Sequence, residues 1–202
     1  MFDFITAFMA GGGLLAVFLL MVLENVFPPI PSELIVPLAG FEAAQGSFPL
    51  WALVVVATLG SVAGSSIWYA LGLWLGERRF LALVDRHGLW LTLDRAEAEA
   101  ATAWFRRHGP VAVLLGRLVP TVRTLISVPA GISGMPLVPF LLYSTAGSLL
   151  WVGLLAVAGW LLGENYKAVE AWLNPVTTLV VLLIVALYLW RLLRALRRRR
   201  GA

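Results

Sequence analysis

The sequence predicts an all-α integral membrane protein whose 202 residues form a single membrane domain. Three observations support this class. Hydrophobic residues make up 60% of the chain and charged residues only 13%, whereas a soluble domain has about 25% charged residues. Several uncharged apolar stretches approach or exceed the roughly 20 residues that a helix needs to cross a bilayer. Two further apolar stretches contain both prolines and charges, so they suit broken helices better than straight spans.

The first predicted repeat covers residues 14–76 and contains the proline-rich stretch LENVFPPIPSELIVPLAG at 23–40. This stretch holds two carboxylates, Glu24 and Glu33. We expect it to form a re-entrant hairpin, because irregular backbone is tolerated at membrane depth only where protein or a water-filled cavity shields it. The residues expected to break its helices are Pro28, Pro31, Pro37 and Gly40. The uncharged stretch 50–76 then predicts a transmembrane helix.

The stretch 77–109 predicts a cytoplasmic connector between two repeats. Its charges alternate in sign, and its arginines follow an apolar span, as the positive-inside rule expects of a cytoplasmic loop. Asp94 and Glu97 form a capping box that predicts the start of a helix, and Gly109 followed by Pro110 predicts its end. We interpret this helix as amphipathic and lying near the membrane surface. A plain solvated helix is the alternative.

The second predicted repeat covers residues 110–163. Its first part is apolar but carries Arg117 and Arg123, and a charge at the bilayer centre costs roughly 2.5–3.5 kcal/mol. We therefore expect a second re-entrant hairpin, followed by a transmembrane helix at 137–163. The residues expected to break this hairpin are Pro120, Pro129 and Gly131. Another apolar stretch and an arginine-rich end predict a C-terminal transmembrane helix with a cytoplasmic tail at residues 175–202.

Short sequence matches indicate that the two repeats arose by duplication. GSSIW at 64–68 matches GSLLW at 147–151, and GLWLGE at 72–77 matches GWLLGE at 159–164. A hairpin that re-emerges on its own side, plus one crossing helix, gives each repeat a single crossing. The second repeat is then inverted relative to the first, as in secondary transporters whose sites lie where the repeats meet. In this arrangement we expect Glu33 to face Arg123. The corresponding second pair is Glu24 and Arg117.

Six glycines in the two predicted spans indicate close helix contacts, because small residues let helix backbones approach each other in membranes. They are Gly60, Gly64, Gly72, Gly147, Gly153 and Gly159. The alternative is the ordinary enrichment of glycine in membrane helices.

Residues that are rare or absent argue against several classes of site. The chain has no cysteine, so neither a disulfide framework nor a thiolate site is available. Its two histidines, His87 and His108, lie in the polar connector, and neither a metal site nor a cofactor is expected. The arginines cluster beside long apolar segments, which argues against nucleic acid as a partner.

Six short motifs together form a recognisable pattern over about residues 15–165. They are Glu24-Asn25, Pro31-Ser32-Glu33, Ala39-Gly40, RRHG at 106–109, Gly116-Arg117-x-x-Pro120-x-x-Arg123-Thr124 and Pro129-Ala130-Gly131. Their combination resembles the DedA family of bacterial inner-membrane proteins, which is related to eukaryotic lipid scramblases. The resemblance implies inverted re-entrant hairpins and, as for several members, flipping of undecaprenyl phosphate coupled to an ion gradient.

The resemblance also implies a set of site residues. The functional acids of the family fall on Glu24 and Glu33, and its functional arginines fall on Arg117 and Arg123. Some members have Pro-Gly-Asp with a longer spacing where this chain has Pro31-Ser32-Glu33. This departure leaves the coupling ion open between protons and sodium.

The residues themselves support a site for a lipid phosphate. Two guanidiniums in a shielded hollow suit a phosphate because they offer bidentate donors of fixed charge. Arg117 and Arg123 are about 1.7 helical turns apart, so a break at Pro120 is needed to bring them together. Burial favours the protonated form of Glu33 and a nearby arginine opposes it, which predicts a proton switch. A structural ion pair that locks the hairpins together is the alternative.

We therefore predict a transporter that flips a polyprenyl phosphate across the inner membrane. The alternatives are a small-solute or ion exchanger on the same scaffold and, with less support, an enzyme acting on lipid phosphates. An enzyme needs a nucleophile with a histidine or paired-acid constellation, and both histidines lie away from the acids. The predicted partners are membrane lipids, undecaprenyl phosphate, and protons or sodium. A homo-oligomer and the side of the N-terminus stay open.

Overall fold

The computed structural model describes residues 2–26, 32–91, 95–120 and 122–162, and the regular structure within these ranges is α-helical. The helices are α1 (Phe2–Val26), α2 (Ser32–Ala44), α3 (Leu50–Leu91), α4 (Arg95–Arg117), α5 (Val122–Leu125), α6 (Ser127–Ile132) and α7 (Leu137–Leu162). The all-α prediction is confirmed. Pro28, Pro31 and the predicted C-terminal helix within 175–202 lie outside the described residues.

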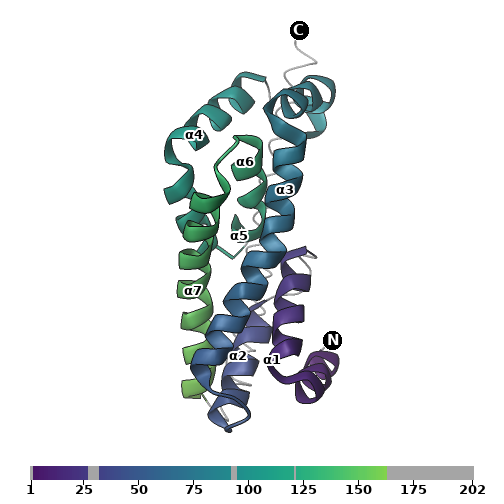
Figure 1. Ribbon diagram of the computed structural model, residues 1–202. Helices are drawn as coiled ribbons and strands as arrows, with labels where there is room; N and C mark the ends of the chain where they lie inside the picture. Colours follow the sequence, from purple (N-terminus) through teal and green to yellow (C-terminus); the bar gives the residue numbers. More distant parts are fainter. Residues whose placement is uncertain (1, 27–31, 92–94, 121, 163–202) are drawn as a thin grey trace.

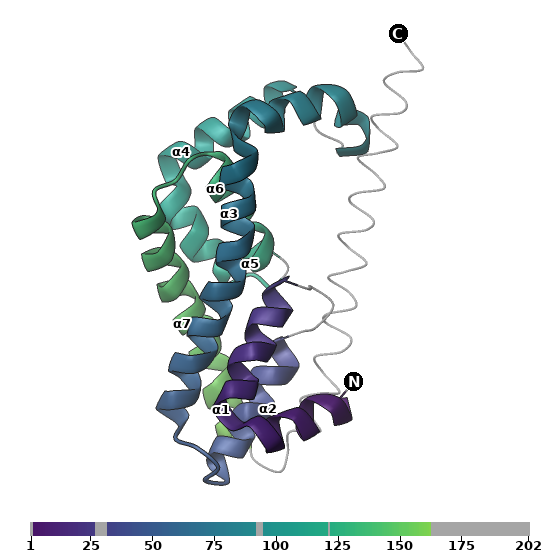
Figure 2. The same ribbon diagram turned by 45° about the vertical axis from the view of Figure 1, so that its right-hand side comes forward.

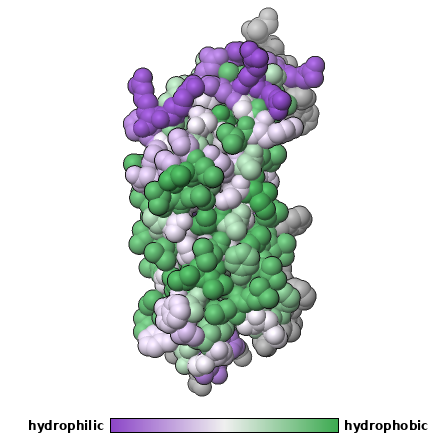
Figure 3. Space-filling view, viewed as in Figure 1, coloured by the Kyte–Doolittle hydropathy of each residue, from purple (hydrophilic) through white to green (hydrophobic). Residues whose placement is uncertain are grey.

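Two long helices, α3 and α7, run in opposite directions along the length of the molecule (Figure 1). Leu50–Arg86 of α3 and Leu137–Leu161 of α7 are long and apolar enough to cross a membrane. Large apolar side chains cover their outer faces, and Trp51 and Leu161 are 71% and 69% exposed. In Figure 3 hydrophobic residues dominate the body, and hydrophilic residues gather at the end formed by α4 and the last part of α3. This surface suits lipid around the body and water at that end.

Two short groups of helices lie one beyond the other along α3 (Figures 1 and 2). α1 and α2 pack beside the first half of α3, whereas α5 and α6 pack beside its second half, nearer α4. α1 ends at Val26 and α2 begins at Ser32. Turns at 118–120 separate α4 from α5, as the break predicted at Pro120 requires. α1 also bends at Gly13, whose φ is 52°, and its first part leaves the bundle (Figure 2).

Four residues expected to break helices lie inside them. Pro37 and Gly40 belong to α2, and Pro129 and Gly131 belong to α6. Their predicted role as helix breakers is wrong. Pro129 is tolerated because it lies in the first turn, where its missing N–H costs no internal hydrogen bond. Pro37 is fully buried in the middle of α2, where neighbouring helices can shield the carbonyl group that it frees.

The connector is more helical than predicted. α3 passes residue 76 and continues to Leu91, with a bend at Gly76, whose φ of 62° lies in the left-handed region that glycine adopts readily. α4 begins at Arg95, and the prediction that it ends at Gly109 and Pro110 is wrong, because it continues to Arg117. The same helix therefore extends from the polar end of the molecule into its centre.

Five of the six predicted glycine contacts are confirmed. A Cβ atom at Gly60 or Gly64 would overlap α1, at Gly72 it would overlap α6, at Gly147 it would overlap α4, and at Gly159 it would overlap α2. The contact predicted at Gly153 is wrong, since no neighbouring atom lies within 4 Å of a Cβ there. Both long helices therefore hold the short helices through backbone contacts that a side chain would block.

Replacing Gly72 with alanine should destabilise the fold by about 1–3 kcal/mol, the usual cost of overpacking. The new Cβ would collide with the carbonyl oxygen of Val128 in α6. A backbone atom cannot relieve the collision by a change of rotamer, as a flexible side chain could. Gly153→Ala is the matched control, because it adds the same atom in open space and favours the helix. Thermal unfolding in detergent compares the two, and equal melting temperatures would contradict the packing.

Candidate functional site

A layer of buried polar side chains crosses the middle of the bundle, between two hydrophobic clusters. On α3 the layer lies between Ala57 of one cluster and Tyr69 of the other. On α7 it lies between Phe140 and Val152. Its members are Glu24, Asn25, Ser61, Ser65, Arg117, Arg123, Thr124, Ser127, Ser144 and Ser148. Serines four residues apart on a helix share one face, so both long helices present hydroxyl groups inward at this level.

Glu24 and Arg123 form a buried ion pair between the two groups of short helices. Nη2 of Arg123 donates a hydrogen bond to Oε1 of Glu24, and each side chain is only 5% exposed. Glu24 lies in the last turns of α1, and Arg123 lies in the short helix α5. The two charges neutralise each other, so removing either one would leave its partner buried and uncompensated.

Asn25 extends this ion pair toward the long helices. Its Nδ2 donates to Oε2 of Glu24 and to the carbonyl oxygen of Met21, both at 3.0 Å, and lies 3.4 Å from Oγ of Ser61. Oγ of Ser61 lies 3.4 Å from Oγ of Ser148 on α7. Polar contacts therefore connect α1, α3 and α7 at the level of the ion pair.

Arg117 is buried without a carboxylate partner among the described residues. It is 1% exposed and ends α4. Its Nη2 donates to the hydroxyls of Ser127 and Ser144, at 3.0 and 3.1 Å, and its Cζ lies 5.9 Å from the ring centroid of Phe140. Within the described part of the chain, Nε and Nη1 have no acceptor. A desolvated cation with two unused donors is costly by itself and is well suited to an anion.

The predicted ion pairs, Glu33 with Arg123 and Glu24 with Arg117, are wrong. Arg123 pairs with Glu24, whereas Arg117 donates to serines. The cause is the unexpected length of α4, which continues to Arg117 and so packs Arg117 against α7. Arg123 lies after the turns at 118–120 and faces Glu24 at the end of α1. Glu33 opens α2 and is partly buried, and no ion pair joins it to another described residue.

Asn25 and the buried serines are not among the predicted site residues. A signal for two of the serines is present in the sequence. Ser61 stands three residues before Gly64, and Ser144 stands three residues before Gly147, so both precede the matched Gly-Ser-x-x-Trp motifs at the same spacing.

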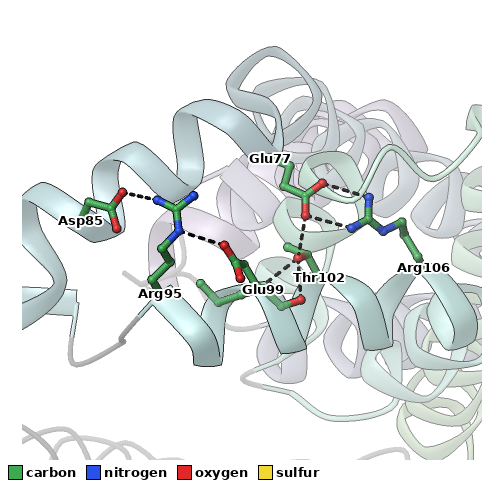
Figure 4. A network of polar contacts seen from close by, with 7 residues as sticks. Glu77, Asp85, Arg95, Glu99, Thr102 and Arg106 are labelled. Carbon is green, nitrogen blue, oxygen red and sulfur yellow. Dashed lines mark hydrogen bonds and ion pairs between the residues drawn. The ribbon is translucent and has the colours of Figure 1, made fainter.

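A second polar network joins α3 to α4 at the polar end of the molecule (Figure 4). Glu77 accepts two hydrogen bonds from Arg106 and one from Thr102. The same network includes the ion pairs of Arg95 with Asp85 and with Glu99. Because most of these side chains are exposed, each pair contributes only about 0–1 kcal/mol. We therefore interpret this network as a contact between helices.

Comparison with known proteins identifies the family. Residues 30–161 match the VTT domain, which covers well over half of the chain. The chain belongs to the DedA family. It is 31% identical over 196 residues to undecaprenyl phosphate transporter A of Staphylococcus aureus, covering 97% of each chain. A Bacillus subtilis protein of the same name is 28% identical over 162 residues, 79% of this chain and 80% of that protein.

Another relative carries a different kind of name. An alkaline phosphatase-like protein of Lactococcus lactis is 35% identical over 188 residues, 93% of this chain and 88% of that protein. No solved structure matches the chain. Membership of the DedA family makes this a membrane protein, in agreement with its apolar surface, and the names of the first two relatives support a role in transport.

Proposed function

We propose that this DedA-family protein moves undecaprenyl phosphate between the leaflets of the bacterial inner membrane. The observation that carries the proposal is Arg117, a buried cation beside the hydroxyls of Ser127 and Ser144 whose Nε and Nη1 find no acceptor among the described residues. A phosphate headgroup would supply the missing negative charge and accept from the free N–H groups. The relatives named as undecaprenyl phosphate transporters provide the substrate class.

The glycine contacts support the inverted repeat that such a transporter requires. Gly72 of α3 meets the carbonyl of Val128 in α6, and Gly159 of α7 meets the carbonyl of Pro37 in α2. Gly72 and Gly159 hold the same place in the two Gly-x-x-Leu-Gly-Glu motifs. Each long helix therefore contacts the second arm of the other repeat's hairpin in the same way, as expected for two halves related by an internal two-fold axis.

The first arms of the hairpins show a matching relation, in which each long helix contacts the first arm of its own repeat. Gly64 meets Val22 and Asn25 of α1, three residues apart, whereas Gly147 meets the corresponding pair in α4, Leu114 and Arg117. Asn25 and Arg117 therefore occupy equivalent positions in the two repeats. One repeat has a neutral amide where the other has a cation, so only one phosphate-binding position is expected in the scaffold.

We place the two groups of short helices in the membrane as re-entrant hairpins, with the connector 77–109 and the C-terminal tail in the cytoplasm. Single cysteines in this cysteine-free chain test the placement. Ala96→Cys and Arg198→Cys should react with an impermeant thiol reagent only from the cytoplasmic side, and Ala168→Cys only from outside. Reaction of Ala96→Cys and Ala168→Cys from the same side would contradict the inverted repeat.

We further propose that the movement of lipid is coupled to a proton or sodium gradient. Glu24 is neutralised by Arg123, whereas Glu33 has no ion pair with a described residue. We therefore assign the proton switch to Glu33 and the connection between the hairpins to Glu24. Glu33→Gln should keep the fold but remove the response of transport to a pH gradient. Retention of that response would contradict the assignment.

The proposed function is tested in vesicles containing the purified protein and undecaprenyl phosphate. A soluble phosphatase added outside hydrolyses only outer-leaflet lipid, so phosphate release beyond the outer-leaflet fraction measures movement. Vesicles with a pH gradient, with a sodium gradient and with neither identify the coupling ion. Movement no faster than in protein-free vesicles would refute the proposal. Phosphate release without added phosphatase would instead favour the enzyme suggested by the name of the Lactococcus relative.

A further inference from the structure

We infer that Asn25 is a positioning residue for the Glu24 carboxylate and connects it, through Ser61 and Ser148, to both long helices. The inference rests on the proposed function only where transport is the readout. The two carboxylate oxygens of Glu24 are held from different sides, Oε1 by Arg123 and Oε2 by Asn25. Two donors on separate oxygens fix the plane of the carboxylate, which a single ion pair does not.

Asn25 is itself held firmly. Its side chain is fully buried, and its Cβ packs where Gly64 leaves room on α3. Its backbone carbonyl accepts a hydrogen bond of 2.7 Å from Nε1 of Trp68. Its amide donates to the carbonyl of Met21 one turn earlier as well as to Glu24. Asn25 therefore has the rigidity that a positioning residue needs.

The amide of Asn25 joins Glu24 to the long helices. Nδ2 donates to Oε2 of Glu24 and lies 3.4 Å from Oγ of Ser61. Oδ1 has no hydrogen-bond partner among the described residues. Because Oγ of Ser61 lies beside Oγ of Ser148, the group that holds the carboxylate is also connected to α7.

Few charges surround this carboxylate. Within the described residues, Arg123 on α5 is its ion-pair partner, and α3 carries no charge between Leu50 and Gly76. The neighbouring α2 carries Glu33 and Glu42, and Arg117 on α4 donates to serines. The hydrogen bond from Asn25 is therefore the second donor to a charge that otherwise has one ion-pair partner among the described residues.

Asn25→Ser tests the inference. The serine hydroxyl is too short to hold Oε2 of Glu24 and bonds back to the carbonyl one turn earlier, as serines in helices do, so the fold is retained. The matched control is Ser66→Ala, which removes a partly buried hydroxyl that lies outside the polar layer and donates within α3 to the carbonyl oxygen of Val62. Asn25→Ala serves in place of the serine variant if that one does not fold.

The measurement is the infrared carboxylate stretching band of Glu24 in reconstituted protein, with the band identified by its loss in Glu24→Gln. Removing the donor to Oε2 should shift this band, because the charged oxygen loses a hydrogen bond. Ser66→Ala should leave the band in place. Lipid movement should fall in the Asn25 variant and stay unchanged in Ser66→Ala.

An unmoved band in a folded Asn25 variant would overturn the positioning role. A moved band with unchanged lipid movement would overturn the connection to transport. If the wild-type protein moves no lipid, the proposed function fails, and the infrared band still decides whether Asn25 positions Glu24.

Discussion

Arg117→Met is expected to abolish lipid movement while leaving the protein as stable as before or more stable. Replacing a buried charge by a well-packed apolar residue of similar volume is often neutral or stabilising, by as much as about 1–4 kcal/mol. Arg117 has no carboxylate to leave behind among the described residues, since its partners are Ser127 and Ser144. Thermal unfolding and lipid movement measured on one preparation therefore separate a role in binding from a role in structure.

Arg117→Lys refines the same test. Lysine keeps the positive charge but loses the planar array of donors that reaches two serines and a phosphate together. We expect a loss of about 3 kcal/mol in apparent affinity for the lipid, or roughly 100-fold. Arg107→Ala, at an exposed position in the connector, is the control and should transport normally. Full activity of Arg117→Lys, or a lowered melting temperature of Arg117→Met, would contradict the phosphate-binding role.

Glu24→Gln, unlike Arg117→Met, is expected to lower the stability of the protein, by about 3–5 kcal/mol. Glutamine leaves the buried guanidinium of Arg123 without its counter-charge, and water cannot reach the guanidinium to solvate it. Unfolding of the purified protein in detergent measures this loss. Glu42→Gln is the control, because Glu42 only accepts a hydrogen bond from Ser47 at an exposed turn.

The double variant Glu24→Gln, Arg123→Met completes this test. Removing the second charge removes the buried, uncompensated cation, so most of the lost stability should return. This coupling is what a double-mutant cycle measures for residues in contact. Additive losses of stability in the two single variants would show that the pair does not join the hairpins. Recovery of stability without recovery of transport would be consistent with the positioning of Glu24 proposed above.

These contrasts separate two arginines that look alike in the sequence. Arg117 and Arg123 lie six residues apart on either side of Pro120, and both are buried. Among the described residues, Arg123 has a carboxylate partner and Arg117 has none. A buried arginine without a counter-ion is costly in a membrane protein, and this cost is the reason that we propose Arg117 as the phosphate-binding residue.

The positions of the long helices were determined by local sequence. Uncharged apolar runs predict the spans of α3 and α7, because only a helix satisfies every backbone group within one segment in lipid. The break before Arg123, at the turns of residues 118–120, also follows from the proline nearby. Five of the six glycine contacts are predicted by the same kind of local argument, because a small residue permits a close approach.

Tertiary structure decided which residues meet. Pro37 and Pro110 lie within helices because surrounding helices compensate for what proline removes, and no local rule reveals that compensation. The added length of α4 places Arg117 beside Ser144 of α7 and Ser127 of α6, and Arg123 pairs with Glu24 rather than with Glu33. The sequence by itself determined that acids and arginines would be buried near proline breaks. Which acid met which arginine depended on the register of helices far apart in the chain.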